Sequence, residues 1–497
     1  MVVTPAPRAA VRRLVVVLLA VVLTAAGVSV SGVLSATGSS FPPATPQAHC
    51  GPGARPETAI QGRVPQRDYD SGRVRRGYRC NTVPVAHHGR TGGFKVLRYT
   101  DARGHTCAFY DSTLLFPKDV AQNVLANSGR GIGVVVLAMD DPAHPRQTAS
   151  LTTPAMLTPH ESVLLNEKRG LLGAVSGNPA TAPGVLDLYD VRTDCRHPRL
   201  LSSTPSALLG HESGWSRDGR TFYAASTGGQ TLVAIDVSDP TVPKPVFTQV
   251  GVNYHGLRLS PDGRRLYVAN IGNGDGAGAR FSNGGLRIVD VSEIQDRVAN
   301  PQVRVLSDLT WPELSIPQVS QPFTRHGREL LLEVDEYANY DFTRLDQSSA
   351  LVGAARIIDV TRPREPFVVS DLRLQVHQPQ ARQGAQQQDP GAALPVQGYA
   401  GHYCSVPRRQ DPKVVACSMI LSGLRVFDIR DLRNPVEVAY FNQPLAASRP
   451  DNPTAEGAFA MSQPAWDVKR RSIWYSDGNT GFYDVRLTNG VGRLLRR

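Results

Sequence analysis

The sequence lacks the short motifs that identify several large classes of enzyme. It has no G-x-S-x-G nucleophile elbow, no P-loop and no G-x-G-x-x-G after a predicted strand. Ser162 and Ser213 each follow a His-Glu pair, but a serine that recurs in two units of a repeat is a poor candidate for a hydrolase nucleophile. No nucleic-acid-binding motif accompanies the net charge of +11, so we expect no nucleic-acid partner. We interpret the excess of basic residues as a solvated surface, which would also suit an acidic wall or membrane.

The clearest apolar run lies at the N-terminus. Three arginines precede the run from Leu14 to Leu23, and small residues follow as far as Ser35. This order is typical of a secretory signal peptide, and an uncleaved signal anchor is the alternative. We therefore assign residues 1–36 to a signal or anchor segment, and residues 37–77, rich in Pro, Gly, Ser and Arg, to a linker. Both alternatives predict a secreted or extracytoplasmic protein that contacts the membrane only through its N-terminal segment.

The chain has few cysteines, six in all, and in an exported protein they are expected to form disulfides. Cys404 and Cys417 lie equally far from the turn at residues 409–412, so a hairpin would place them opposite each other. We predict that these two cysteines form a disulfide. The sequence permits several pairings of the remaining four, which we assign as Cys107–Cys195 and Cys50–Cys80.

Residues 254–307 contain a pattern that predicts four short antiparallel strands. Residues 255–259 alternate apolar and polar side chains, which is the period-two pattern of a half-buried strand. The sequence Ser260-Pro-Asp-Gly263 predicts a tight turn, because Pro presets the first turn dihedral and Gly accepts a positive φ. Further strands are predicted at 265–270, 286–291 and 303–306. One such sheet cannot bury its own faces, so it requires stacked neighbours.

Variants of this unit recur along the chain, most visibly as an apolar strand that ends in Asp. Seven copies of a four-strand unit predict an all-β fold, a seven-bladed β-propeller over residues 78–497, with an open β-solenoid as the alternative. We interpret the Gln- and Pro-rich residues 375–398 as a surface loop and expect a monomer. The sequence leaves open which segment closes the ring. The repeated aspartates, expected to accept backbone N–H bonds in the following turn, are Asp140, Asp190, Asp236, Asp290, Asp359, Asp428 and Asp484.

Several repeated phrases carry a family resemblance. LRIVDVS, LVAIDVSDP, RIIDVTRP and LRVFDIRDLRNP resemble the repeat of LVIVD-repeat proteins, and SPDGRRLYVAN resembles the YVTN family of surface-exposed β-propellers. The similarity covers residues 85–490. It implies a propeller outside the membrane, and it implies no particular activity because many members of these families have none assigned.

Histidines occupy one position in several of the repeats. His160, His211, His255 and His402 each lie at the same distance before the turn of their own unit. That position begins the first strand of a blade, which lines the central channel of a propeller. Near the same position lie Gln318 in the fifth unit, Gln463 in the seventh, and His87 or His88 in the first.

A ring of imidazoles at a channel mouth could bind Zn, Cu or Fe, and His160, His211 and His255 are the candidate ligands. Glu161 and Glu212, each directly after a histidine, would be further ligands or hydrogen-bond acceptors for the ligands. One alternative is a small polar or anionic ligand bound in the same funnel by these five residues and His402. The other is that the histidines serve only hydrogen bonds between the inner strands.

The acidic residues Glu333, Asp335, Glu336 and Asp341 resemble a cation site only loosely, and we interpret them as a solvated loop at a strand end. The first functional prediction is a ligand-binding or protein-interaction module at the cell envelope, with a small ligand or an envelope protein as partner. The alternative is a metal-dependent oxidoreductase or lyase in which the histidines hold the metal.

Overall fold

The structure of the protein is a computed structural model that describes residues 41–112, 132–177, 183–274, 281–282, 284–311, 316–336, 352–392, 398–445 and 457–496. The chain divides into two compact units, residues 1–42 and residues 43–497, and the second unit holds the sheets. The predicted signal or anchor segment lies outside the described residues. Within the described ranges, no helix is both long enough and apolar enough to cross a membrane.

The unit at residues 254–307 forms one four-stranded antiparallel sheet, as its sequence predicts. The strands lie in the order β15 (Tyr254–Leu259), β16 (Arg265–Asn270), β19 (Gly285–Asp290) and β20 (Arg304–Thr310). Gly263 has a φ of 76° in the turn after β15, and its N–H donates to the carbonyl of Ser260 at 2.9 Å. The first three strands are mostly buried and β20 is largely exposed, because only the outer edge of the sheet faces solvent.

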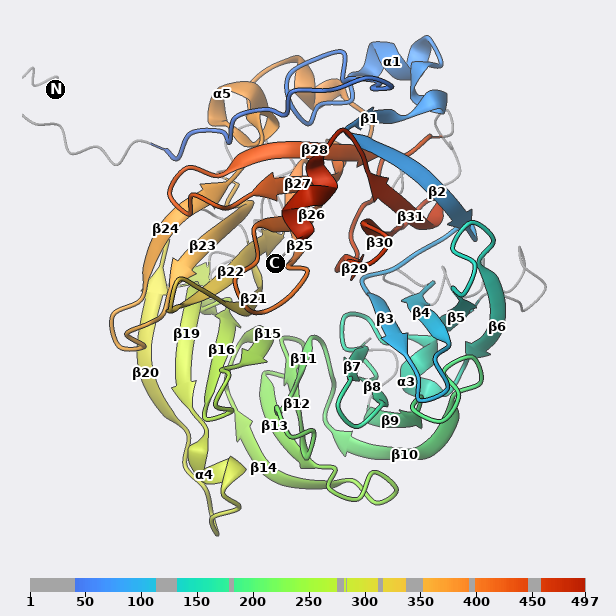
Figure 1. The fold of residues 1–497 in the computed structure, drawn as a ribbon. Coiled ribbons are helices and arrows are strands. Elements are labelled where there is room, and N and C mark those ends of the chain that lie inside the picture. The colour runs from blue at the N-terminus through green and yellow to red at the C-terminus, as the bar shows by residue number, and fades with distance from the viewer. Residues whose placement is uncertain are drawn as a thin grey trace, which may run out of the picture. The chain divides into compact units, whose positions relative to one another are not determined.

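Seven sheets of this kind surround a common centre (Figure 1), so the predicted seven-bladed β-propeller is confirmed. Apolar side chains of adjacent sheets pack against one another, as Phe109 of the first blade does with Leu172 of the second.

The first blade contains β3 (Val96–Thr100), β4 (Thr106–Asp111), β5 (Val134–Ala138) and β6 (Arg146–Leu151). The second contains β7 (Leu164–Asn166), β8 (Leu171–Val175), β9 (Gly184–Asp190) and β10 (Arg199–Ala207). The third contains β11 (Ser213–Trp215), β12 (Thr221–Ser226), β13 (Thr231–Asp236) and β14 (Lys244–Val250).

The last three blades follow the same order from the inner strand outward. The fifth contains β21 (Ile316–Arg325), β22 (Arg328–Glu336), β23 (Ala355–Asp359) and β24 (Phe367–Leu372). The sixth contains β25 (Ala400–Ser405), β26 (Val414–Ile420), β27 (Gly423–Asp428) and β28 (Val436–Asn442). The seventh contains β29 (Ala465–Asp467), β30 (Ser472–Asp477) and β31 (Gly481–Leu487). A two-stranded ribbon, β17 (Asn273–Gly274) with β18 (Phe281–Ser282), extends from the fourth blade.

The ring is closed by a strand from the N-terminal side of the propeller. β2 (Thr82–His88) pairs antiparallel with β31 and becomes the outer strand of the seventh blade. Just before it, β1 (Tyr78–Cys80) pairs with β28 as a fifth strand of the sixth blade. Figure 1 shows both strands beside the C-terminal blades, which joins the two ends of the propeller non-covalently.

Residues 43–77 do not form the predicted linker, because they fold onto the propeller. The segment contains α1 (Gln66–Asp70) and a 3-10 turn, η1 (Arg73–Arg76). Val64, Tyr69 and Val74 are buried against Tyr440 of the sixth blade. The composition of this segment predicted a linker, because composition does not show that its few spaced apolar residues pack against the sixth blade.

A buried ion network fixes this segment to the sixth blade. The guanidinium of Arg425, on β27, forms ion pairs with Glu57 and with Glu437, the latter at 3.0 Å. All three side chains are fully buried. Gln61 donates to the second oxygen of Glu437 at 3.0 Å, and the N–H of Ala48 donates to the same oxygen at 3.2 Å.

All three predicted disulfides are present. Cys404 and Cys417 face each other across β25 and β26, as the symmetry of their hairpin predicts. The other two bonds are Cys107–Cys195, between the first two blades, and Cys50–Cys80, within the N-terminal segment. Three disulfides indicate a protein that matures in an oxidising environment.

The predicted surface loop at residues 375–398 is folded over most of its described length. It contains η3 (Gln375–His377), α5 (Pro379–Arg382) and η4 (Ala385–Gln388). Asp389 pairs with Arg63 at 2.7 Å and thereby joins this segment to the N-terminal one. Short helical turns elsewhere are α3 (Pro154–Leu157), α4 (Ser292–Gln295) and η6 (Val491–Leu495).

The repeated aspartates mostly perform the predicted structural role. One carboxylate oxygen accepts the backbone N–H of the residue two positions later, at 2.8 to 2.9 Å, in five of the repeats: Asp190, Asp236, Asp290, Asp359 and Asp428. Asp140 instead accepts the N–H of Thr106.

Candidate functional site: an imidazole–carboxylate cluster

The four histidines singled out by their repeat position converge at the inner ends of their blades. His255 and His402 lie on the innermost strands β15 and β25. His160 and His211 lie in the turns just before β7 and β11 rather than on the strands themselves. His255 and His402 are buried, and His160 and His211 are half-buried.

Three of the imidazoles approach one another through their Nε2 atoms. The Nε2 atoms of His160 and His211 are 3.2 Å apart, and those of His211 and His255 are 3.0 Å apart. Two ligand atoms held about 2.0 to 2.2 Å from one metal ion lie about 3 Å from each other in adjacent positions. Each of these two spacings therefore matches that of neighbouring ligands to one ion. The imidazoles therefore come within ligand spacing of one another although they belong to different blades.

Two buried carboxylates complete the group. The oxygens of Glu336 lie 2.8 Å from Nε2 of His255 and 3.2 Å from Nε2 of His402. Those of Glu161 lie 3.4 Å from Nε2 of His211 and 3.5 Å from Nε2 of His402. Glu161 belongs to two sets of potential ligands, one with His160 and His211 and the other with His255 and Glu336. We call the six side chains the imidazole–carboxylate cluster: His160, His211, His255, His402, Glu161 and Glu336.

The far nitrogens of the imidazoles are held by oxygen atoms. Nδ1 of His402 is 2.5 Å from the carbonyl of Met461, and Nδ1 of His255 is 3.3 Å from the carbonyl of Gln318. Because a carbonyl only accepts hydrogen bonds, each of these Nδ1 atoms carries a proton. Nδ1 of His211 lies 3.3 Å from the hydroxyl of Thr227. This arrangement turns Nε2 toward the centre, as in the histidine ligands of metal sites.

Two buried oxygen atoms at the cluster make no hydrogen bond of good geometry with the described residues. They are Oε2 of Glu161 and Oε1 of Gln318. Both side chains are almost completely buried, and the amide of Gln318 donates to the other oxygen of Glu161 at 2.6 Å. Leaving a buried polar group without a partner costs about 1 to 3 kcal/mol, and more when it is charged. A cation beside Glu161 would compensate that cost.

The electrostatics differ between neighbouring imidazoles. Burial and the charge of His211 lower the pKa of His160 to about 3, so this imidazole is neutral at pH 7. Burial also opposes charge on His255, but the carboxylates of Glu336 and Glu161 outweigh it and raise the pKa to about 9. The pKa of Glu336 is lowered, because its attraction to His255 exceeds the cost of burial. The cluster therefore holds carboxylates ready for a cation, with one imidazolium as the present counter-charge.

His160 has an uncommon backbone conformation. Its φ of 52° lies in the left-handed region, which non-glycine residues seldom adopt. A Cβ on neighbouring Gly177 would lie 2.7 Å from the Cβ of His160, so this glycine provides the space for the turn. Backbone strain of this kind is concentrated at functional sites, where the surrounding structure maintains it.

Glu212, predicted with Glu161 from the two His-Glu-Ser triplets, is occupied by other partners. It accepts hydrogen bonds from Lys95 and Tyr403, and from Arg258 at 2.7 Å. The Lys95 ammonium also lies 3.8 Å from the centre of the Tyr403 ring. Burial lowers the pKa of Lys95 to about 8, although Glu212 opposes the shift. This glutamate therefore neutralises two buried cations and does not face the imidazoles.

The remaining repeat positions are filled in three ways. His87 and His88, predicted to serve the first blade, lie on the closing strand β2 instead. Phe94 takes the place in the first blade, with its ring 4.9 Å from that of His160 and 5.3 Å from that of His402. Gln318 contacts the cluster as described above, whereas Gln463 accepts a hydrogen bond from Arg258 at 3.1 Å.

The acidic residues at the end of β22 were predicted to form a solvated loop, and this is wrong for the three that the structure describes. Glu336 belongs to the imidazole–carboxylate cluster, and Glu333 and Asp335 pair with the buried Arg356. Asp341 lies outside the described residues. The alternation of side chains along β22 could have predicted that Glu336 is buried. Residues 334 and 336 lie on the same face of the strand, and the apolar Val334 indicates that this face points into the protein.

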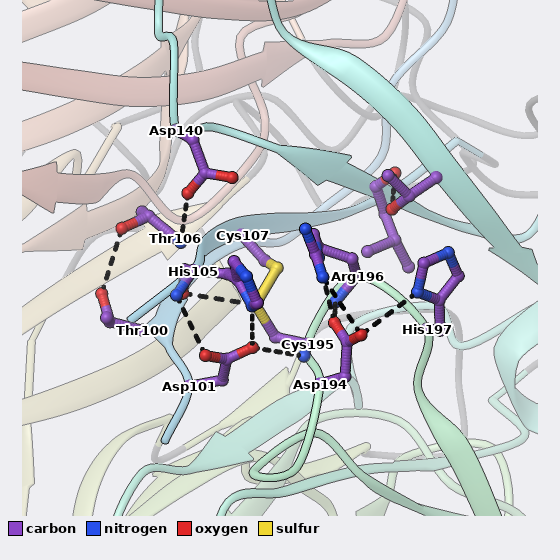
Figure 2. Close-up of a disulfide and its surroundings, with 12 residues drawn as sticks. Thr100, Asp101, His105, Thr106, Cys107, Asp140, Asp194, Cys195, Arg196 and His197 are labelled. Atoms are coloured by element: carbon purple, nitrogen blue, oxygen red, sulfur yellow. Dashed lines mark hydrogen bonds and ion pairs between the residues drawn. A yellow bond between two sulfur atoms is a disulfide. The ribbon is translucent and has the colours of Figure 1, made fainter. Parts of the chain in front are cut away.

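A second group of potential ligands lies beside the disulfide Cys107–Cys195. Figure 2 shows Asp101, His105 and Asp194 there, and their donor atoms are close enough to share an ion. Both oxygens of Asp101, however, already accept N–H bonds, including one from Cys195 at 3.0 Å. Asp194 accepts bonds from Arg196 and His197. These carboxylates stabilise the turns around the disulfide and offer no free oxygen to a metal.

Comparison with known proteins finds solved structures of low sequence identity and no relative in sequence. The chain matches no protein-family model, and no curated protein matches it in sequence. A solved structure of a Lactobacillus plantarum protein is 13% identical with a TM-score of 0.48, and the match covers 71% of this chain and 86% of that one. The periplasmic gluconolactonase of Pseudomonas aeruginosa is 13% identical with a TM-score of 0.47, covering 71% and 87%. A protein of unknown function from Desulfotomaculum acetoxidans is 11% identical, with a TM-score of 0.42 and coverage of 71% and 89%. At these identities the likeness concerns the arrangement of strands and not the site.

Proposed function

We propose that this protein is an extracytoplasmic β-propeller that binds one first-row transition-metal ion in the imidazole–carboxylate cluster. Zn, Cu and Fe are the candidates, because imidazole suits all three. The observation that carries the proposal is the approach of Nε2 of His211 to those of His160 and His255, at 3.2 and 3.0 Å, beside two buried carboxylates. Through the metal, the protein would bind a small polar or anionic ligand at the inner end of its blades.

A network of hydrogen bonds alone does not account for these contacts. Nε2 of His211 has either one proton or one lone pair, yet it lies within 3.4 Å of two other Nε2 atoms and of Glu161. Nε2 of His255 is already close to a better acceptor, Glu336, at 2.8 Å. One shared cation would satisfy all of these lone pairs at once, which protons cannot do.

The proposal is tested by metal analysis of the protein after purification without chelator or a metal-affinity tag. We expect close to one equivalent of transition metal by elemental analysis and native mass spectrometry. His211→Ala should lose most of it, whereas His326→Ala, at an exposed turn of the fifth blade, should retain it. Substoichiometric metal together with no binding on titration with Zn²⁺ or Cu²⁺ would refute the proposal. Two equivalents would instead indicate that Glu161 bridges a metal pair.

Export and family membership are part of the same proposal. The apolar run at residues 14–23 supports a secretory signal or anchor, and the three disulfides support an oxidising location. The LRIVDVS-type phrases support membership of the LVIVD-repeat propellers. Expression with residues 1–36 deleted should abolish export, and mass spectrometry of the exported protein would give the cleavage site.

A metal-dependent enzyme, an oxidoreductase or lyase, is the second candidate. It is favoured by the unequal burial of the cluster, since His160 and His211 are half-buried while the other members are buried. An ion there could be reached from the half-buried side and could exchange a water for a substrate oxygen. Turnover of a substrate that requires the metal, and is lost in His211→Ala, would distinguish an enzyme from a binding module.

A further inference from the structure

A separate cavity of about 680 Å³ lies where the N-terminal segment and β2 meet the sixth and seventh blades. Its size is in the range of cavities that bind small organic ligands. Four arginines line it, Arg55, Arg76, Arg79 and Arg90. We call it the arginine cavity. None of the residues of the imidazole–carboxylate cluster lines it.

The positive charge of the arginine cavity has no paired counter-charge among the described residues. Among the residues that the structure describes, none of the four arginines has a carboxylate within ion-pair distance. Burial, and then the charges of Arg79, Arg73 and Arg76, lower the pKa of Arg55. Repulsion of this kind costs stability unless an anion relieves it.

Two of the arginines are held directly opposite each other by the backbone. Arg55 and Arg79 form an antiparallel bridge in which each N–H donates to the other's carbonyl at 2.8 Å. Like charges at directly opposed positions of a sheet are destabilising. The neighbouring disulfide Cys50–Cys80 ties the two short segments together. The fold therefore maintains an unfavourable pair of charges in a fixed place.

The guanidinium groups are oriented but not saturated. Nε of Arg79 donates to the carbonyl of Gly53 at 3.0 Å, and Nη1 of Arg55 donates to the carbonyl of Arg76. Each guanidinium has five N–H donors, so most of them remain for a ligand. Paired N–H donors of arginine match the oxygens of phosphate and carboxylate groups.

The rest of the lining combines apolar side chains, among them Pro84, Val85 and Pro444, with the polar His87 and Thr480. A bare inorganic ion would leave this surface uncovered. We propose that the arginine cavity binds an organic phosphate of about the size of a sugar phosphate. Its phosphate group would lie between Arg55 and Arg79, and its carrier would pack on the apolar surface that Pro84, Val85 and Pro444 leave accessible.

The proposal is tested by isothermal titration of the full-length exported protein with glucose 1-phosphate, with glucose and with inorganic phosphate. We expect saturable binding of glucose 1-phosphate, weaker binding of inorganic phosphate and none of glucose. Replacing Arg55 and Arg79 together by Gln should weaken binding by at least roughly 100-fold, because both charge-assisted contacts to the phosphate are lost. Arg90→Gln, at an exposed position, should weaken it severalfold.

The matched control removes the same charge elsewhere. Arg146 and Arg364 are exposed, and their double replacement by Gln should leave the affinity unchanged. No saturable binding of glucose 1-phosphate, or equal loss in the control, would overturn the proposal. Equal affinity for inorganic phosphate would overturn the assignment of an organic carrier. Binding confined to vesicles of phosphatidylglycerol, without binding of glucose 1-phosphate, would identify a lipid surface and also overturn it.

Discussion

Arg425→Met should destabilise the protein strongly, because it removes the only cation of a buried three-residue network. The guanidinium pairs with Glu57 and Glu437 and lies 4.7 Å from the centre of the Tyr440 ring. Methionine preserves much of the volume but leaves two carboxylates buried without their counter-charge. Breaking a buried pair in this way costs about 3 to 5 kcal/mol. Urea unfolding with the disulfides intact, followed by tryptophan fluorescence, would measure the loss.

The pH dependence of this loss has a definite sign. Burial already raises the pKa of Glu57, and removal of Arg425 would raise it further. When a carboxyl group has a higher pKa in the folded than in the unfolded protein, the folded protein loses stability as the pH rises from the unfolded-state pKa to the folded-state pKa. The variant should therefore be more destabilised at pH 7.5 than at pH 5. Replacing Glu57 and Glu437 by Gln in the same chain should recover part of the stability.

The control is Arg364→Met, an exposed arginine outside any ion pair in the described parts of the chain. We expect it to change the free energy of unfolding by less than about 0.5 kcal/mol. A change below about 1 kcal/mol for Arg425→Met would refute the reasoning. It would mean that residues 43–77 contribute little to the folded propeller, as a linker would.

Three further predictions concern the cluster and the blades. His255 has a pKa of about 9 and must lose its proton when a cation binds. The apparent Zn²⁺ affinity should therefore rise roughly tenfold per pH unit from pH 6.5 to 8.5, as measured by competition with a chelator. An affinity that does not change with pH would contradict this prediction. Gly256→Ala should weaken metal binding at least tenfold in the same assay, because the new methyl group would overlap the Gln318 carbonyl that orients His255. Replacing Cys107 and Cys195 by Ser opens a link between residues 88 apart and should cost about 4 kcal/mol in urea unfolding, whereas a cost near zero would show that the two blades need no such link.

Much of the propeller can be predicted because blade strands are specified locally. In the unit at 254–307, alternation and the turn at Ser260–Gly263 fix both strands of a hairpin without reference to the rest of the chain. The pairing of Cys404 with Cys417 is equally local, since it follows from their symmetric distance to one turn. Non-local features were missed or left open: the closing strand β2, and the docking of residues 43–77 through Glu57.

The candidate site divides in the same way. A fixed offset from the turn places His160, His211, His255 and His402 at one level of the ring, because each repeat has the same length up to that turn. Glu336 shares no such offset. It lies at the far end of β22, and only the closed ring brings it to 2.8 Å from His255.

The sequence by itself determines the repeat, the strands and the histidine position, because each depends on neighbours within one blade. The tertiary structure decides which of those side chains meet. It turns Glu161 toward the imidazoles and Glu212 toward Lys95, although both follow a histidine in the same triplet. It also replaces the expected His87 or His88 by Phe94. The physical reason is that ring closure sets distances between residues on different blades, which the local pattern of any one blade does not contain.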